Sequence, residues 1–340
     1  MKKLINKPEN IAQELISGLV KSHPQYLKMA GDNLLIRSTP KSKGKVQIVF
    51  GQGIGHEPAF DGMLGFGMHD VEIPGNIFTC SGGDRIYEGI KYAWEESGHT
   101  PILLLIANHE GDVINGGIAL EMARDEGIDV QEIILYDDIA SAPKGEEKNR
   151  RGMAGIIFSF KLAGALAEEG KSRNEIIDVV SKINADTRTL AVAISPATIP
   201  TTGQLLFTLA DDEIIIGPGV HGEAGPEGPM KLSPASEVMD VVAERVLEDG
   251  DFQAGDEVLV LINGSGATTL MEMFILYDRL DEILKEKNIT PYKPLIGNYV
   301  TTQEMAGFSL SLCKANQEVK RLWDSPADTP YFKVSGGMNG

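Results

Sequence analysis

Cysteine is nearly absent from this sequence. Cys80 and Cys313 are the only two, and they lie far apart, which excludes a disulfide framework and a Cys-x-x-Cys metal site. No stretch approaches the roughly 18 uninterrupted apolar residues that a membrane helix requires. The N-terminal Met1-Lys-Lys-Leu-Ile-Asn-Lys7 also lacks the apolar core of a signal peptide. These absences predict a soluble protein of the reducing cytoplasm, without a membrane partner.

Basic side chains are scarce relative to acidic ones. With 31 Lys and Arg against 49 Asp and Glu, the net charge is -18, and a field of that sign repels nucleic acid phosphates. Direct binding of DNA or RNA is therefore not expected. The histidines His23, His69, His99 and His109 have no partners at a metal-ligand spacing, so we expect no metal site.

The chain has 340 residues, enough for two domains, and its patterns alternate between strand and helix. We therefore predict an α/β fold with two α/β domains, over residues 1–185 and 186–340. Strands are expected at 46–50, 102–106, 130–135, 191–194, 213–216, 257–262, 295–299 and 308–312. Helices are expected at 84–96, 113–126, 153–169, 173–183, 236–247 and 270–285.

A glycine-rich loop, Gly51-Gln-Gly-Ile-Gly-His-Glu-Pro58, follows the first of these strands. Its glycines would let the backbone approach a small polar ligand. The loop fits neither the GxGxxG fingerprint nor GxxxxGK, so it is weak support for nucleotide binding. His56 can exchange protons near neutral pH, although a histidine beside glycines can equally be a structural hydrogen bonder.

Polar residues, Asn108-His-Glu-Gly-Asp112, follow the apolar run at 102–106. Ligands of open α/β sheets bind at the carboxyl ends of strands, which makes Asp112 a candidate acid or base. Capping of a helix that begins at Val113 is the simpler interpretation of the same residue. Both roles are compatible.

A second glycine-rich run carries His221 in Gly217-Pro-Gly-Val-His-Gly-Glu-Ala-Gly225. A neutral imidazole nitrogen is a competent nucleophile toward a ketone carbon when an acid supplies a proton to the oxygen. The alternative is a loop histidine with a structural role.

Taken together, these motifs resemble the K subunit of the dihydroxyacetone kinase family. The resemblance rests on the runs at 51–58, 108–112 and 217–225 and on Arg150-Arg-Gly-Met-Ala-Gly155, in matching order and spacing. It also covers Phe207-Thr-Leu-Ala-Asp211, Gly266-Ala-Thr-Thr-Leu270 and Leu295-Ile-Gly297, and thus nearly the whole chain.

The resemblance implies a substrate-binding subunit of a ketose kinase. His221 would bond covalently to the ketone carbon of dihydroxyacetone or a slightly longer ketose as a hemiaminal. His56 and Asp112 would be the acid and base around the substrate hydroxyls, and the backbone at Gly53 would hold the ligand. Ile54, Gly55, Ala107 and Asn108 would line the site. This chain would bind no cofactor, because ATP or ADP with magnesium belongs to a partner L-type subunit. Members commonly form homodimers.

Three segments depart from the family pattern. Gly51-Gln-Gly-Ile-Gly-His56 replaces Gly-Gly-Gly-Ser-Gly-His, Ala107-Asn-His109 replaces Lys-Asn-Tyr, and Thr79-Cys-Ser-Gly-Gly-Asp84 replaces Thr-Ser-Pro-Thr-Pro-Asp. Ala107 removes a cationic donor and opens volume, while Ile54 adds apolar bulk. These changes leave the ketose and the phosphoryl donor open. They also motivate an alternative function, a non-catalytic dihydroxyacetone-binding coactivator of a transcription regulator.

Overall fold

The computed structural model describes residues 2–31 and 33–335. The chain divides into two compact units that alternate along the sequence. The N-terminal unit comprises Lys2–Leu135, Phe158–Lys182 and the chain from Arg321, and the C-terminal unit comprises Tyr136–Ile157 and Ile183–Lys320. This division differs from the two consecutive domains that we predicted to meet near residue 186. Residues 136–157 belong to the C-terminal unit, and the chain after Lys320 belongs to the N-terminal unit. The two domains over 1–185 and 186–340 stay a prediction.

The N-terminal unit is built on a six-stranded sheet in the order β1-β2-β4-β3-β5-β6. Strands β4, β3, β5 and β6 are mutually parallel neighbours, whereas β1 and β2 join antiparallel at one edge. The carboxyl ends of β3 and β5 consequently lie at the same edge of the sheet. The strands are β1 (Leu27–Ala30), β2 (Leu34–Arg37), β3 (Gln47–Ile54), β4 (Val71–Ile77), β5 (Ile102–Ala107) and β6 (Val130–Leu135).

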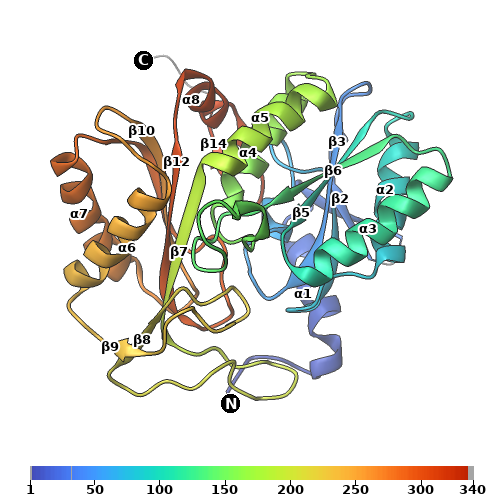
Figure 1. The fold of residues 1–340 in the computed structure, drawn as a ribbon. Coiled ribbons are helices and arrows are strands. Elements are labelled where there is room, and N and C mark those ends of the chain that lie inside the picture. Colours follow the sequence, from blue (N-terminus) through green and yellow to red (C-terminus); the bar gives the residue numbers. More distant parts are fainter. Residues whose placement is uncertain (1, 32, 336–340) are drawn as a thin grey trace. The chain divides into compact units, whose positions relative to one another are not determined.

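Helices cover both faces of this sheet (Figure 1). On one face, α2 (Gly83–Glu96) and α3 (Glu110–Asp125) bury Ile90 and Leu120 against strand residues such as Leu104. On the other face, Phe160 of α4 (Ile156–Glu168) packs edge-on against Phe50, with ring centroids 4.8 Å apart. The unit also contains α1 (Ile11–Ser22), most of α5 (Arg173–Asp186), the end of α8 (Gln317–Asp324), the hairpin β13 (Ala327–Asp328) and β14 (Lys333–Val334), and the short helices η1 (Pro8–Asn10) and η2 (Asp61–Met63).

The C-terminal unit has its own six-stranded sheet, in the order β11-β10-β12-β7-β8-β9. Among the described strands of this sheet, β10 and β11 pair in parallel and the other neighbours pair antiparallel. Helices α6 (Ala235–Asp249) and α7 (Leu270–Glu286) pack on one face and bury Val242 and Leu280 against Val260 and Leu310. The strands are β7 (Thr187–Ser195), β8 (Glu213–Ile216), β9 (Met230–Lys231), β10 (Glu257–Gly264), β11 (Thr290–Gly297) and β12 (Ala306–Lys314), and η3 (Glu147–Asn149) precedes β7.

The predicted α/β class is confirmed, and three local expectations are corrected. Strand β3 continues through Gly51 to Ile54, so only the second half of the glycine-rich run is a turn. Helix α3 begins at Glu110 rather than Val113. Strand β4 was not expected, because Pro74 and Gly75 interrupt its pattern.

Across the residues that the structure describes, no helix combines the length and the apolar composition needed to cross a membrane.

Candidate functional site

His56 lies in the turn that follows β3 and is completely buried. Its ring lies against Phe78, with centroids 5.4 Å apart and an interplanar angle of 46°. Its carbonyl accepts a hydrogen bond from the Ala59 amide at 3.1 Å, which closes the turn. The backbone therefore fixes this imidazole at the carboxyl edge of the sheet.

The glycines of this loop are required by a neighbouring segment of the chain. A Cβ at Gly53 would lie 2.6 Å from the Thr79 nitrogen, and one at Gly55 would lie 2.7 Å from the Phe78 ring. Gly55 also has φ +113°, a conformation that favours glycine. Its amide donates to the Glu57 carboxylate at 2.8 Å. The loop thus packs against 78–79, and one of its amides is already bound to an acidic side chain.

The end of β5 carries the second group of predicted residues. Ala107 is buried, and the Asn108 amide donates to the Leu135 carbonyl of β6 at 2.9 Å. His109 occupies the N-cap position of α3, so Asp112 is not the cap that was the simpler interpretation. Asp112 is instead a buried carboxyl in the first turn, where the helix dipole favours negative charge.

The N-terminal unit contains further buried carboxyls. Burial raises the pKa of Asp61 to about 8, with a smaller contribution from Glu57. Burial also raises the pKa of Glu72 well above its usual value, and the carboxyls of Asp61 and Asp112 add to this effect. The imidazole of His69 lies 2.8 Å from Glu72, from Nε2 to Oε2. Burial therefore favours the protonated forms of Asp61 and Glu72.

His221 belongs to the C-terminal unit and lies in the loop after β8. Its side chain is 25% exposed. Gly217 and Gly222 have φ values of +83° and +76°, so the loop folds back tightly on both sides of the histidine. The Val220 carbonyl accepts a hydrogen bond from the Thr302 hydroxyl at 2.6 Å. The backbone next to His221 is therefore held by Thr302, which lies in the connection between β11 and β12.

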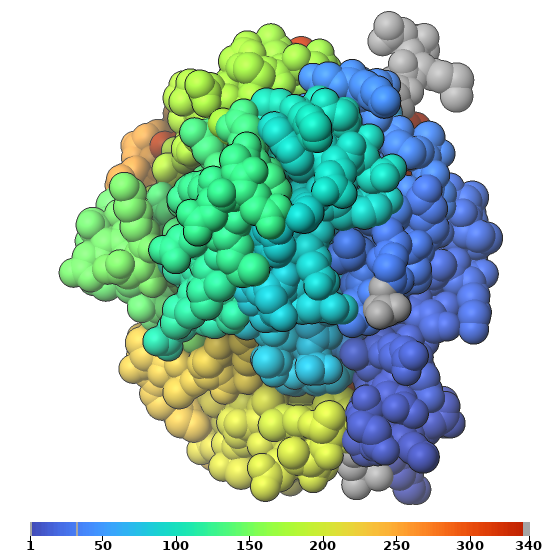
Figure 2. All heavy atoms as spheres, turned by 90° about the vertical axis from the view of Figure 1, so that its right-hand side faces the viewer, coloured from blue at the N-terminus to red at the C-terminus, as the bar shows by residue number. Residues whose placement is uncertain are grey.

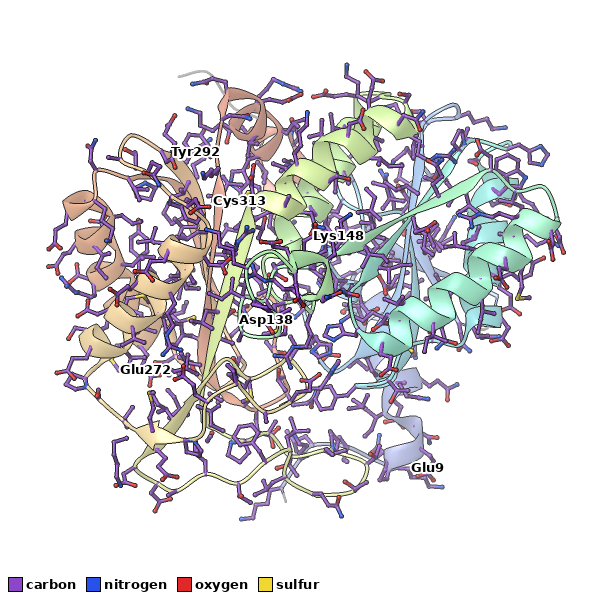
Figure 3. The ribbon with its side chains drawn as sticks, viewed as in Figure 1. Glu9, Asp138, Lys148, Glu272, Tyr292 and Cys313 are labelled. Carbon is purple, nitrogen blue, oxygen red and sulfur yellow. The ribbon has the colours of Figure 1, made fainter. Side chains whose placement is uncertain are left out.

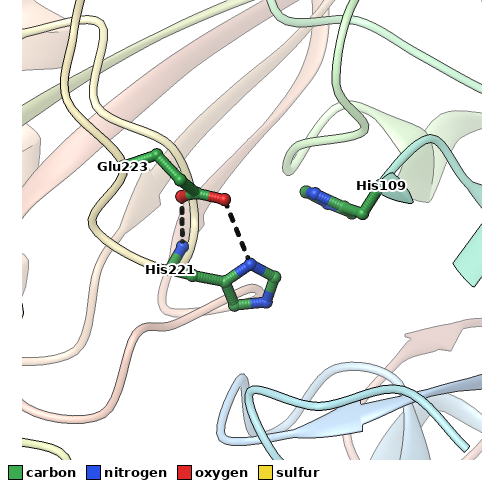
Figure 4. Close-up of side chains that lie close together, drawn as sticks. All are labelled: His109, His221 and Glu223. Atoms are coloured by element: carbon green, nitrogen blue, oxygen red, sulfur yellow. Dashed lines mark hydrogen bonds and ion pairs between the residues drawn. The ribbon is translucent and has the colours of Figure 1, made fainter. Parts of the chain in front are cut away.

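Glu223 is the functional candidate that sequence reasoning missed. Its Oε2 accepts the His221 amide at 2.9 Å, and its Oε1 lies 3.2 Å from the ring Nδ1 (Figure 4). Partial burial opposes ionisation, but the hydrogen bonds from the His221 side chain and backbone lower the pKa of Glu223 to about 2. The carboxylate is thus ionised and oriented on Nδ1, and Nε2 is the ring nitrogen that Glu223 does not hold. The His-x-Glu spacing was the signal that could have found it.

Arg151 also contacts the loop that carries His221. Its guanidinium contacts the buried Asp138 carboxylate at 2.7 Å, and it reaches the Gly217 carbonyl at 3.4 Å. Asp138, labelled in Figure 3, lies on the segment that follows β6. A Cβ at Gly219 would lie 2.6 Å from this guanidinium and 2.2 Å from Glu223, so only glycine fits there. The glycines of 217–222 therefore allow His221, Glu223 and Arg151 to pack together.

The Dak1 domain family matches residues 17–331. This chain belongs to the Dak1 domain family. Among relatives of this Dak1 chain, a dihydroxyacetone-binding subunit DhaK of a PTS-dependent dihydroxyacetone kinase from Listeria innocua is 37% identical over 98% of this chain and 100% of its own length. A D-erythrulose kinase from Mycolicibacterium smegmatis is 34% identical over 98% of this chain and 57% of its own length.

A solved structure gives a similar result for this Dak1 chain. The dihydroxyacetone kinase operon co-activator DhaQ superposes with a TM-score of 0.86 at 29% identity, over 93% of this chain and 97% of that protein. The family and its fold are thus shown, while relatives include both kinase subunits and a co-activator.

The structure brings some predicted residues together within each unit. In the N-terminal unit, His56, Asn108 and Asp112 follow the carboxyl ends of the paired strands β3 and β5. In the C-terminal unit, His221 lies with Glu223 and Arg151. Ile54 is 2% exposed and belongs to the core of its unit, as does Ala107. The roles of all these residues are predictions.

Proposed function

We propose that this protein is the substrate-binding subunit of a dihydroxyacetone-kinase-type ketose kinase. It holds a short hydroxyketone covalently on His221, and a partner subunit phosphorylates the ketone's terminal hydroxyl. The observation that carries this proposal is the ionised Glu223 carboxylate 3.2 Å from Nδ1 of His221. The identity to dihydroxyacetone-binding subunits over the whole chain supports it.

Glu223 selects the tautomer that the chemistry needs. With the proton on Nδ1 and directed at the carboxylate, Nε2 keeps its lone pair and can attack the ketone carbon. The new N–C bond displaces the carbonyl π pair onto oxygen, which takes a proton from an acid, for which we propose His56. The ring becomes positive as the bond forms, and the adjacent carboxylate stabilises that charge. A hydroxyl compound without a carbonyl cannot form this adduct.

Asp112 is proposed as the base for phosphorylation. A buried carboxylate at the start of α3 can accept the proton that the substrate hydroxyl loses when it attacks a phosphoryl group. The phosphoryl group comes from ATP, or from ADP recharged by a phosphotransferase protein, on an L-type subunit with magnesium. The 51–58 loop does not fit phosphate, because the Gly55 amide is bound to Glu57 and burial opposes added negative charge.

The substrate class is a ketose of three or four carbons. Relatives named as dihydroxyacetone-binding subunits and as erythrulose kinases match this chain at similar identity.

Turnover with a purified L-type subunit tests the proposal. Ketose-dependent ATP consumption is expected with dihydroxyacetone or erythrulose and is expected to disappear in His56→Asn. His99→Asn, a surface change on the loop before β5, is the matched control and keeps full turnover. Absence of turnover with every short ketose tested would contradict the proposal.

A second candidate function is a dihydroxyacetone-binding coactivator of a transcription regulator. The TM-score of 0.86 to the co-activator DhaQ and the altered loops at 51–56 and 79–84 favour it. It predicts a ligand-dependent complex with a DNA-binding protein and no productive complex with an L-type subunit. A pull-down with both partners distinguishes the two functions.

Two further proposals concern the state of the protein in the cell. We propose a homodimer in the cytoplasm, as in the K subunits that the motifs resemble. Sedimentation at micromolar concentration should give twice the mass of the chain, and a monomer mass would contradict the homodimer.

A further inference from the structure

Residues 326–334, which include β13 and β14, form a strap across η2 and the loop that follows it in the N-terminal unit. The Tyr331 amide donates a hydrogen bond to the Gly62 carbonyl at 2.9 Å. The Asp328 amide donates to the Phe66 carbonyl, also at 2.9 Å, and these two residues pair as an isolated antiparallel bridge. The strap is therefore bound to this loop through its own backbone at two points.

Two glycines under the strap leave the space that it occupies. A Cβ at Gly62 would lie 2.7 Å from the Tyr331 ring. A Cβ at Gly67 would lie 2.3 Å from the Pro326 carbonyl oxygen. Gly67 also has φ +75°, a conformation that favours glycine. A larger residue at either position would push the strap away, so the sequence of the loop fits this covering segment.

Thr329 closes a turn inside the strap and is completely buried. Its hydroxyl oxygen accepts the Phe332 amide at 2.8 Å and lies 2.9 Å from the Phe332 carbonyl oxygen. The same hydroxyl lies 3.3 Å from the Gly62 carbonyl oxygen. One buried side chain thus shapes the turn of the strap and meets the carbonyl that Tyr331 holds.

Gly62 connects the strap to the turn that carries His56. The Gly62 amide donates to the Pro58 carbonyl at 3.0 Å, and the Ala59 amide donates to the His56 carbonyl at 3.1 Å. Backbone hydrogen bonds therefore continue from the strap through Gly62 to the start of this turn. Because the His56 side chain is completely buried, the position of its imidazole follows the position of that backbone.

Side chains near the surface hold the strap at a second place. The Tyr26 hydroxyl donates to the Asp328 carboxylate at 3.0 Å, and the Lys333 ammonium donates to the Tyr26 hydroxyl at 2.6 Å. The Tyr331 ring lies against that of His23, with centroids 5.4 Å apart. His23 and Tyr26 belong to the N-terminal part of the chain, which is blue in Figure 2 and forms one side of the surface in that view. These contacts can be changed without touching the buried turn.

We propose that the strap positions the His56 imidazole and that Thr329 is its main positioning residue. The effect on turnover rests on the proposed function, in which His56 supplies the proton to the ketone oxygen. The effect on the ring does not depend on that function. A misplacement of about 1 Å can slow a proton transfer of this kind by roughly a hundredfold, so a loosened strap lowers turnover without removing any group that touches the substrate.

Thr329→Val tests the proposal, because it removes the hydroxyl and keeps the shape of the side chain. The imidazole NMR signals of His56, identified by their loss in His56→Asn, are expected to shift. With an L-type subunit and dihydroxyacetone, kcat is expected to fall about tenfold, while KM for the ketone stays within about twofold. Thr329→Ser keeps the hydroxyl and is expected to restore both readouts.

Thr100→Val is the matched control. Its hydroxyl is also buried in the N-terminal unit but has no hydrogen-bond partner among the described residues, so its loss should leave the His56 signals and kcat unchanged.

A second variant, Tyr26→Phe with Lys333→Gln, loosens the strap from its surface side and should fold even if Thr329→Val does not. A smaller shift of the same His56 signals is expected. Unchanged His56 signals in the folded variants, or shifted signals with full turnover, overturn the positioning role. If the unchanged protein turns over no short ketose, the proposed function is contradicted, and the His56 signals still decide whether the strap positions the ring.

Discussion

His221 and Glu223 form the pair on which the proposed chemistry depends. Histidine alone was visible in the sequence as a glycine-flanked ring with no partner. The structure shows that the partner is Glu223. The loop turns at Gly222, which places the Glu223 carboxylate against both the His221 amide and Nδ1. Spacing can indicate such a pair, but the turn that closes it depends on backbone conformation.

Glu223→Gln is expected to weaken ketone binding about tenfold, or roughly 1.4 kcal/mol, because the neutral amide no longer stabilises the cationic ring of the adduct. Isothermal titration with dihydroxyacetone measures this. Glu227→Gln is the matched control, since Glu227 lies in the same loop and pairs with Arg245 at 3.0 Å. Equal affinity of both variants for dihydroxyacetone would contradict a role of Glu223 in ketone binding.

Asp61 gives a pH-dependent prediction. Its pKa is raised from 3.8 to about 8 by burial, so the folded state holds a proton that the unfolded chain releases. This contribution to the free energy of unfolding is fully present below about pH 4 and is lost as the pH rises toward 8. Asp61→Asn should remove that part of the pH dependence. Urea unfolding between pH 4 and 8 tests it, and parallel curves for both proteins would contradict it.

At the scale of the elements, strands and helices with regular patterns were predictable, and turns were not. The strand at 130–135 and the helix after Asp84 follow from apolar periodicity. The start of α3 at Glu110 was missed because Asp112 is a common cap residue, whereas the structure uses His109. Strand β4 was missed because Pro74 and Gly75 lie within it, tolerated where the pairing with β3 shifts register.

Replacing either of two glycines in the N-terminal unit by alanine is expected to change the free energy of unfolding in opposite directions. Gly53→Ala places a Cβ 2.6 Å from the Thr79 backbone and should destabilise by about 1–3 kcal/mol. Gly117→Ala, in α3 with nothing within 4 Å of the added carbon, should stabilise by about 0.5–1 kcal/mol. Urea denaturation measures both. A stable Gly53→Ala protein would contradict the close packing of the loop on residues 78–79.

At the scale of the whole molecule, sequence patterns did not predict that the chain passes back and forth between the two units. Residues 137–151 read as an exposed polar loop, yet Arg150 is 1% exposed and binds Asp249 of α6 through two contacts of 2.7 Å. Near the C-terminus, the Lys161 ammonium donates to the Leu322 carbonyl at 2.7 Å within the N-terminal unit. Such long-range buried contacts leave no periodic signal.

Arg150→Met is expected to destabilise the protein by about 1–3 kcal/mol, because the largely buried Asp249 carboxylate loses its bidentate partner while Arg188 still contacts it at 2.5 Å. Arg124→Met is the control, since its ion pair with Glu132 is exposed and should contribute under about 1 kcal/mol. Thermal unfolding compares the two. Equal losses would mean that 136–157 is not anchored through Arg150.

A crystal soaked with dihydroxyacetone, and a second soaked with erythrulose, tests the central claim most directly. The account predicts continuous density from Nε2 of His221 to a tetrahedral ketone carbon, with Glu223 still on Nδ1, and loss of that density in His221→Ala. Ketone density separated from Nε2 by a van der Waals gap, or no ketone at His221 with either compound, would contradict it.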